Sequence, residues 1–331
     1  MPTRFSCGVA ALLVGAVVFV AAPVAQAAQA ADDYPRKPVR LIVPTAPGGP
    51  VDIVARIVVP GLAAELGQPF VIDNRAGAGG IVGAEMVARA LPDGYTLLMT
   101  HSGLLGLAPM MFTPQPYDSI RDFAPVSVAA AMPMLLLAHP GLAAKSVPEL
   151  VALAKSQPGK LNFASGGTGT GIHVAFELFN MTTGIKITHV PYKGAAPGMT
   201  GVMAGEADLM FNGLPSALPF IKAGRLRALA VGGARRTPLL PALPTVAESG
   251  VSFDYSGWFA VVAPARMPPP IAARLHDALA RILARAEMKE QLSGQGIEPI
   301  GSTPAQFAVF LREENSRLEK VVVAAGLRQN K

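Results

Sequence analysis

Short β-rich segments that end in glycine-rich loops and lead into amphipathic helices recur along this chain. The segment 39–43 is followed by a Gly/Pro loop and by a helical pattern over about residues 51–66, which Gly67 stops. This alternation favours an α/β fold with parallel strands between layers of helices. The other predicted elements are strands 69–73, 95–100, 135–138, 161–165, 186–190, 208–211, 226–231 and 258–262, and helices 82–90, 172–181, 270–292 and 304–325.

The predicted elements form two series of similar size, which indicates two lobes. We expect residues 31–130 together with 250–331 to form lobe 1, and residues 131–249 to form lobe 2, with the final helices returning to the first lobe. Two crossings, near 124–138 and 244–258, would then make a hinge. Within lobe 2, Ser146 followed by a proline and Glu149 predicts a helix start with a capping box.

The first 30 residues read as a secretory signal peptide. Arg4 precedes an apolar stretch over residues 7–22, and two A-x-A patterns offer cleavage after Ala27 or Ala30. An uncleaved membrane anchor is the alternative, but small residues end the segment and no basic cluster follows. Cys7 is the only cysteine, so cleavage leaves a mature chain without disulfides, thiolate catalysis or cysteine-bound metal. We therefore expect a periplasmic protein.

Composition excludes several classes of function. The chain is 51% hydrophobic and 15% charged, which is typical of a globular protein. Its net charge of +6 comes from scattered basic residues, so nucleic acid is not an expected partner. The sequence contains no G-x-S-x-G or H-E-x-x-H motif, and its histidines are dispersed. We predict no catalytic residue, no metal and no cofactor.

Four loops could hold a ligand, because ligands of open α/β sheets bind beyond the carboxyl ends of the strands. They are residues 44–52, 74–80, 165–173 and 191–194. The first three are glycine-rich and open a helix, whose free amide groups and positive dipole end favour an anion. Each loop could instead be only a tight turn. The glycine spacing matches neither a P-loop nor G-x-G-x-x-G, which disfavours nucleotides.

Two of these loops carry residues with a structural alternative. Asp52 lies in the first turn of its predicted helix, where a carboxylate stabilises the helix dipole without touching any ligand. His173 lies one turn into its own helix, and a lone histidine there is more often a hydrogen-bonded packing residue than a catalyst.

Motifs along the mature chain resemble those of the tripartite tricarboxylate transporter substrate-binding family, also called the Bug family. The matching stretches are residues 34–52 with Ala55-Arg56, residues 73–80, 92–98, 122–127, 169–173 and 191–194, and Leu243-Pro244-Thr245. The resemblance implies a two-lobed periplasmic-binding-protein-like fold of type II. It also implies a ligand carboxylate held by the loops at 45–52 and 165–173, partly through ordered water, and an integral-membrane permease as partner.

Two departures from the family pattern concern the ligand rather than the fold. Many members carry Asp-Asn before Leu-Pro-Ser, where this chain has Asn212-Gly213, and the usual glycine after Trp-Phe is Ala260. The predicted ligand-binding residues are Thr45, Pro47, Gly48, Gly49, Asp52, Ser102, Ser165, Thr168, Gly169, Thr170, His173, Tyr192 and Asn212.

We therefore expect a monomeric receptor that closes its lobes on a small organic acid and delivers it to the permease. A ligand sensor for a signalling kinase and a periplasmic enzyme on the same scaffold are the alternatives. The sequence leaves the acid itself open.

Overall fold

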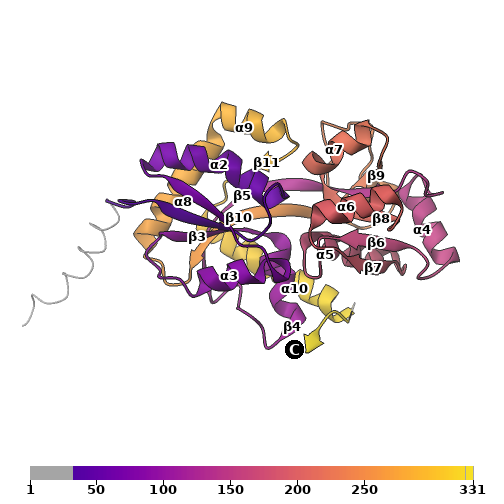
Figure 1. Cartoon of the computed structure of the whole chain (residues 1–331), viewed down its shortest axis with the longest axis horizontal. Helices are drawn as coiled ribbons and strands as arrows, with labels where there is room; N and C mark the ends of the chain where they lie inside the picture. Colours follow the sequence, from indigo (N-terminus) through magenta and orange to yellow (C-terminus); the bar gives the residue numbers. More distant parts are fainter. Residues whose placement is uncertain (1–32, 325, 331) are drawn as a thin grey trace, which may run out of the picture.

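The structure is a computed structural model that describes residues 33–324 and 326–330. The predicted signal peptide and Cys7 lie outside these residues and stay predictions. Figure 1 shows an elongated molecule with strands near its centre and helices around them. Within the described residues, no helix combines the length and the apolar character needed to cross a membrane.

Three parallel strands and two helices alternate at the start of the described chain. They are β1 (Val39–Val43), α2 (Pro50–Leu66), β2 (Phe70–Asn74), α3 (Ile81–Ala88) and β3 (Thr96–His101). β1 lies between β2 and β3 and pairs in parallel with both. Gly67 ends α2 with a φ of 72°, a left-handed conformation that glycine adopts without strain. This part of the fold follows the predicted order.

One strand of 16 residues, β5 (Phe123–Ala138), crosses the molecule. The sequence predicts a strand only over 135–138, and no secondary structure for the apolar run before it, which contains Pro125 and Pro133. In the structure that run is a strand as well, so the prediction was too short. The pairing register with β10 (Ser256–Pro264) shifts just beside Pro125, and such an irregularity accommodates a proline within a sheet.

The next part of the chain repeats the strand–helix alternation. Its elements are α4 (Val147–Ser156), β6 (Asn162–Ser165), α5 (Gly171–Thr183), β7 (Thr188–Pro191), α6 (Ala195–Ala204), β8 (Leu209–Gly213), α7 (Leu214–Lys222) and β9 (Arg227–Val231). β6 pairs in parallel with β7 and β8, and β8 and β9 each pair antiparallel with the end of β5.

The start of α4 confirms only half of the predicted capping box. The Ser146 hydroxyl accepts a hydrogen bond from the Glu149 amide at 3.4 Å. The Glu149 carboxylate, however, accepts from the amide of Lys145 at 2.9 Å and not from that of Ser146. The helix starts where the sequence indicates. The bond back from the Glu149 side chain goes to the amide of Lys145, one residue before the expected Ser146.

The C-terminal region differs from the prediction in two ways. Its elements are α8 (Pro269–Ala284), α9 (Ala286–Ser293), β11 (Glu298–Pro299) and α10 (Pro304–Ala324). The single helix predicted over 270–292 is two helices, because Arg285 has an extended backbone with a ψ of 138°. α10 reaches past the first lobe predicted for it, since its first half and its second half pack into different cores.

Ten strands of the described residues form one sheet in the order β2-β1-β3-β10-β5-β8-β6-β7, with β9 and β11 also paired to β5. We call β2, β1, β3, β10, β11 and their helices the β1 side, and β6 to β9 with α4 to α7 the β6 side. The α/β fold is confirmed, and each side has three parallel strands. β5 joins the two sides, because it pairs with β10 on one and with β8 and β9 on the other, and both β5 and β10 are antiparallel to their neighbours.

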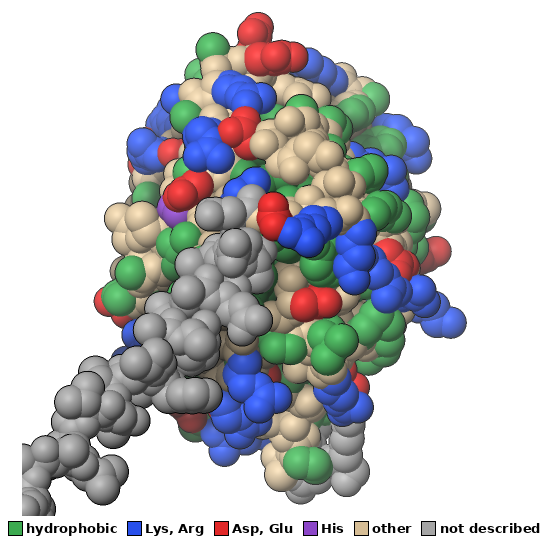
Figure 2. Space-filling model, turned by 90° about the vertical axis from the view of Figure 1, so that its left-hand side faces the viewer, with side chains coloured by type: hydrophobic (Ala, Val, Ile, Leu, Met, Phe, Trp, Pro, Cys, Tyr) green, Lys and Arg blue, Asp and Glu red, His purple; other side chains and the backbone are tan. Residues whose placement is uncertain are grey.

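Buried apolar residues form separate cores on the two sides. On the β1 side, one core lies between the sheet and α2 and α8, and a second one includes Trp258, Phe307 and Leu311. The core of the β6 side contains Phe163 and Phe176 and extends to the second half of α10. Basic and acidic side chains intermingle on the end of the molecule shown in Figure 2.

The remaining described elements are short. They are β4 (Phe112–Thr113), which pairs with β12 (Gln329–Asn330), the 3₁₀ segments η1 (Ala78–Gly80), η3 (Ala108–Met111) and η4 (Ala247–Ser249), and the π-helical turn η2 (Gly103–Leu107). Two of them matter for the site, because η1 follows β2 and η2 follows β3 at the carboxyl ends of these strands.

Candidate functional site

The loop between β1 and α2, residues 44–49, is held by a buried carboxylate. Gly48 has a φ of 80°, and its amide donates to Oδ2 of Asp52 at 2.8 Å. Gly49 caps α2 with no side-chain bond, so the first amides of the helix keep no intrahelical acceptor. Pro47 and Gly48 are exposed beside them. This loop thus has the geometry of an anion site.

Both carboxylate oxygens of Asp52 already accept hydrogen bonds within the protein. Asp52 is 1% exposed, and besides the Gly48 bond its Oδ2 accepts from Nε of Arg56 at 2.7 Å and its Oδ1 from Nδ2 of Asn74 at 3.0 Å. Burial alone would raise the pKa of Asp52, but the bonds from Arg56, Gly48 and Asn74 hold it below its usual value. The carboxylate therefore ties the loop to α2 and to the end of β2.

Thr45 differs from Asp52, because its side chain is uncommitted. Its carbonyl accepts from Asn74 at 3.0 Å. Its Oγ1 is enclosed and has no hydrogen-bond partner among the described residues, although a buried hydroxyl is normally paired. Asn74, which the sequence reading did not single out as a ligand-site residue, thus supports both Thr45 and Asp52.

The loop after β6, residues 166–170, presents a second helix start. The Thr170 hydroxyl donates to the carbonyl of Gly167 at 2.7 Å, and Thr170 caps α5 without a side-chain bond. The first intrahelical bond of α5 runs from the Val174 amide to the Thr170 carbonyl. The amides of the first turn therefore have no acceptor within the helix.

Loops from the two sides of the sheet meet at this point. A Cβ placed on Gly79, in the loop after β2, would lie 3.1 Å from the carbonyl oxygen of Thr168. A Cβ placed on Gly103, after β3, would lie only 2.4 Å from the amide nitrogen of Gly171. The structure thus brings together the loops that follow β2, β3 and β6.

Ser102 lies beside Gly171 and contacts Tyr255, a residue that the sequence did not identify as part of the site. Its Oγ lies 3.0 Å from the hydroxyl of Tyr255, and both residues are buried. A Cβ on Gly171 would lie 3.2 Å from the Ser102 Oγ and 3.4 Å from the Tyr255 hydroxyl. Tyr255 lies just before β10 and within the crossing predicted near 244–258. That position was the only feature of the sequence that could have pointed to it.

Ser165, Gly169 and His173 are buried and bonded within or beside this loop. Ser165 is 0% exposed, and its Oγ accepts from the Gly167 amide at 3.0 Å. The buried His173 accepts the Gly169 amide on Nδ1 at 3.2 Å. This agrees with the alternative reading of His173 as a hydrogen-bonded packing residue.

Two predicted residues make their contacts elsewhere. The hydroxyl of Tyr192 donates to Glu206 at 3.2 Å, beyond the C-terminal end of α6. The buried side chain of Asn212 accepts the amide of Gly213 at 2.8 Å, and its Nδ2 lies 3.5 Å from the sulfur of Met199. Both side chains are satisfied within the β6 side, so neither offers a free group to the other loops.

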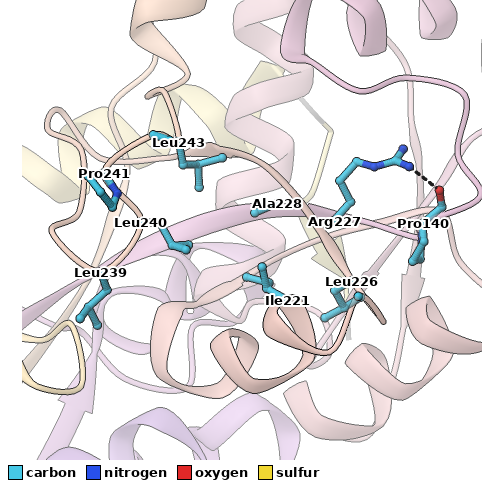
Figure 3. Close-up of a pocket in the computed structure, with 11 residues that line it drawn as sticks. Pro140, Ile221, Leu226, Arg227, Ala228, Leu239, Leu240, Pro241 and Leu243 are labelled. Atoms are coloured by element: carbon cyan, nitrogen blue, oxygen red, sulfur yellow. Dashed lines mark hydrogen bonds between the residues drawn. The ribbon is translucent and has the colours of Figure 1, made fainter.

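Two cavities of the described residues are lined by residues outside the loops at 44–49 and 166–170. One, of about 600 Å³, is the groove of Figure 3, which is lined mostly by apolar side chains such as Leu226, Leu239 and Leu243, with Arg227 beside Pro140. The Arg227 guanidinium donates to the carbonyl of Pro140 at 2.7 Å and is thereby occupied. The other, of about 1100 Å³, lies between β5, β11, α10 and residues 233–239. We base the candidate site on the hydrogen-bond geometry of the loops, because in this arrangement they close on one another.

The arrangement gives little support to enzyme chemistry. Ser165 Oγ and Nε2 of His189 are 2.6 Å apart, which resembles a nucleophile–base contact. However, Ser165 is fully buried and also bonds both the amide and the carbonyl of Gly167. Among the described residues, no three His, Cys, Asp or Glu side chains are grouped to hold a metal ion.

Comparison with known proteins gives consistent matches. Residues 54–327 match the model of the family described as "Tripartite tricarboxylate transporter family receptor". BugT of Bordetella pertussis is 37% identical over 311 residues, which cover 93% of this chain and 95% of that protein.

Two solved structures extend this similarity to the fold. One is R. palustris Rpa4515 with adipate, at 37% identity and a TM-score of 0.84, covering 89% of this chain and 99% of that one. The other is MatC from Rhodopseudomonas palustris with bound malate, at 34% identity and a TM-score of 0.81, covering 87% of this chain and 100% of that one.

Proposed function

The chain belongs to the tripartite tricarboxylate transporter receptor family, and on that premise we propose that it captures a small carboxylate-bearing molecule between the two sides of its sheet. The observation that carries the proposal is the meeting of the helix-opening loop after β2, at Gly79, with the one after β6, at Thr168. The loop before α2 adjoins them, because a Cβ on Gly80 would lie 3.2 Å from the carbonyl oxygen of Pro44. Rpa4515 with adipate and MatC with malate support a dicarboxylate as the class of ligand.

The proposed contacts use groups that the protein leaves uncommitted. The first-turn amides of α2 and α5 offer donors to carboxylate oxygens, and helix N-termini favour negative charge. Thr45 adds an enclosed hydroxyl without a partner in the described chain. Thr168 and Thr170 stand on the opposite loop. Asp52, in contrast, keeps the first loop in shape without touching the ligand.

We assign the predicted lobes, residues 31–130 with 250–331 and residues 131–249, to the β1 side and the β6 side. The connections that would bend are β5 and the segment that leads into β10. Closure about them would bring Gly103 against Gly171, and we take the described arrangement, in which these two residues meet, as the closed form. Hinge closure of this kind is a common way of trapping a small ligand.

The partner and the location follow from the family and from the N-terminus. We propose that the predicted signal peptide exports the chain to the periplasm, and that the receptor works as a monomer and hands its ligand to an integral-membrane permease. The burial of Ser165 supports binding without turnover.

Calorimetric titration with adipate and malate tests the proposed ligand class. We expect a dissociation constant of about 1 μM or tighter, equivalent to about −8 kcal/mol. Dimethyl adipate is the matched control, because it keeps the carbon skeleton and removes both charges. Binding of the ester as tight as that of adipate, or the absence of binding by every di- and tricarboxylate tried, would contradict the proposal.

A further inference from the structure

A stack of aromatic rings lies under the loop at residues 166–170. The imidazoles of His173, on α5, and His189, on β7, are stacked with centroids 4.0 Å apart and planes at 20°. The Phe163 ring, on β6, stacks on His189 at 4.8 Å. Three different elements thus contribute one ring each, so the position of both imidazoles is set by the core of the β6 side.

Each imidazole is linked to one glycine of the loop. His173 accepts the Gly169 amide directly on Nδ1 at 3.2 Å. His189 reaches Gly167 through Ser165: its Nε2 lies 2.6 Å from the Ser165 Oγ, which accepts the Gly167 amide at 3.0 Å. Gly167 and Gly169 have φ values of 121° and 82°, so their conformation is one that needs such support.

The hydrogen bonds of His173 and His189 to the loop require a defined protonation of the two imidazole rings. Because Nδ1 of His173 accepts a hydrogen bond, its proton is on Nε2, which faces the Glu177 carboxylate at 3.6 Å. Burial, together with the neighbouring His173, lowers the pKa of His189 to about 3, so this ring is neutral at physiological pH.

We propose that His173 and His189 are positioning residues for ligand binding: their stacked neutral rings hold Gly167 and Gly169 so that the loop presents its amides to the ligand carboxylate. Neither ring contacts the ligand in this scheme. The inference rests on the proposed function, and it assigns a role to His189, which the sequence pattern did not single out.

Substitution by Asn or Gln can test which ring nitrogen makes each hydrogen bond. The side-chain oxygen of Asn lies about where Nδ1 of a histidine lies, and that of Gln about where Nε2 lies. At position 173, His173→Asn should keep the bond to Gly169, and His173→Gln should lose it. At position 189 the order reverses, since His189→Gln can reach Ser165 and His189→Asn cannot. We expect the two bond-keeping variants to bind adipate within about threefold of wild type, and the other two to bind roughly tenfold more weakly.

A partly exposed histidine of the same side provides the matched control. His139 also accepts an amide on Nδ1, that of Gly141 at 3.0 Å, but it lies away from the loop. Its exchange for Asn or Gln should leave adipate binding unchanged. Equal losses for Asn and Gln at position 173, or at position 189, would show a packing role only and overturn the proposal.

A second measurement does not depend on any ligand. Hydrogen exchange of the Gly169 amide in the full-length ligand-free protein should be about tenfold faster in His173→Gln than in His173→Asn. The same exchange rate in both variants would refute the positioning role. If wild type binds no carboxylate while this contrast holds, the proposed ligand class fails and the positioning of the loop stands.

Discussion

Gly103 and Gly171 come from opposite sides of the sheet and touch through their backbones. A Cβ on Gly103 would lie 2.4 Å from the Gly171 amide nitrogen and 2.7 Å from the Thr170 carbonyl carbon. Both neighbours are backbone atoms, which cannot rotate away as a side chain can. Glycine at position 103 is therefore a condition for this closed arrangement.

The first prediction is that Gly103→Ala weakens ligand binding without unfolding the protein. The added methyl group prevents the contact with α5, so adipate affinity should fall by about tenfold or more, equivalent to at least about 1.4 kcal/mol. Calorimetry measures the affinity, and thermal unfolding checks the fold. Gly106→Ala in the same turn is the control, because its Cβ would meet side-chain atoms of Leu318 and Asn315 and no backbone atom of α5. Similar affinities for both variants would argue against closure through Gly103.

The second prediction concerns the unpaired hydroxyl of Thr45. Thr45→Val keeps the shape and removes Oγ1, so the ligand-free protein should keep its stability or gain up to about 1 kcal/mol. Adipate affinity should fall, because a proposed contact is lost. Denaturant unfolding and titration of the same sample separate the two effects. Unchanged affinity would remove Thr45 from the proposed contacts.

The third prediction separates the two possible roles of Asp52. Because three donors converge on its buried carboxylate, Asp52→Asn should lower the free energy of unfolding by about 1.5–3 kcal/mol. The effect should fade in acid, since a carboxylate with a lowered pKa stabilises the fold above its unfolded pKa and loses this contribution as the pH falls. Denaturant unfolding of both proteins between pH 7 and pH 3 measures the difference. A loss of affinity with unchanged stability would instead indicate direct ligand contact.

The fourth prediction is a coupling between Ser102 and Tyr255. Their hydroxyls are 3.0 Å apart in a buried place, so Ser102→Ala and Tyr255→Phe should not be additive. A double-mutant cycle should give a coupling of about 0.5–1.5 kcal/mol. The same cycle is also measured on adipate affinity. A coupling in affinity but not in the stability of the ligand-free protein would mean that the bond forms only when the ligand is bound. Complete additivity in both stability and affinity would mean that the hydroxyls do not interact.

The fifth prediction concerns pH and His101. Burial lowers the pKa of His101 to about 4, whereas a histidine in the unfolded chain has a pKa of about 6.5. Below about pH 6.5 the unfolded chain binds more protons, so the free energy of unfolding falls by up to about 1.4 kcal/mol per pH unit until about pH 4. Denaturant unfolding at several pH values should show a smaller slope for His101→Asn than for wild type. The partly exposed His139, exchanged in the same way, is the control.

The order of strands and helices could be predicted from the sequence because it depends on local patterns. Gly67 stops α2, and the apolar segment 39–43 is a strand, for reasons contained in a few neighbouring residues. The same reasoning made β5 too short and joined α8 to α9. The register shift beside Pro125 depends on the partner strand β10, which no local pattern indicates. The break at Arg285 has no glycine or proline to mark it.

The sequence by itself determined the fold class, the family and the loops that approach the site, because helix starts and turn glycines depend on a few neighbouring residues. Only the tertiary structure decided what each side chain in those loops does. It committed Asp52 to Gly48, Arg56 and Asn74 and left the Thr45 hydroxyl without a partner among the described residues. It also placed Tyr255 and His189 against residues far away in the chain. The physical reason is that a hydrogen bond or a ring contact depends on distance in space, which no local pattern contains.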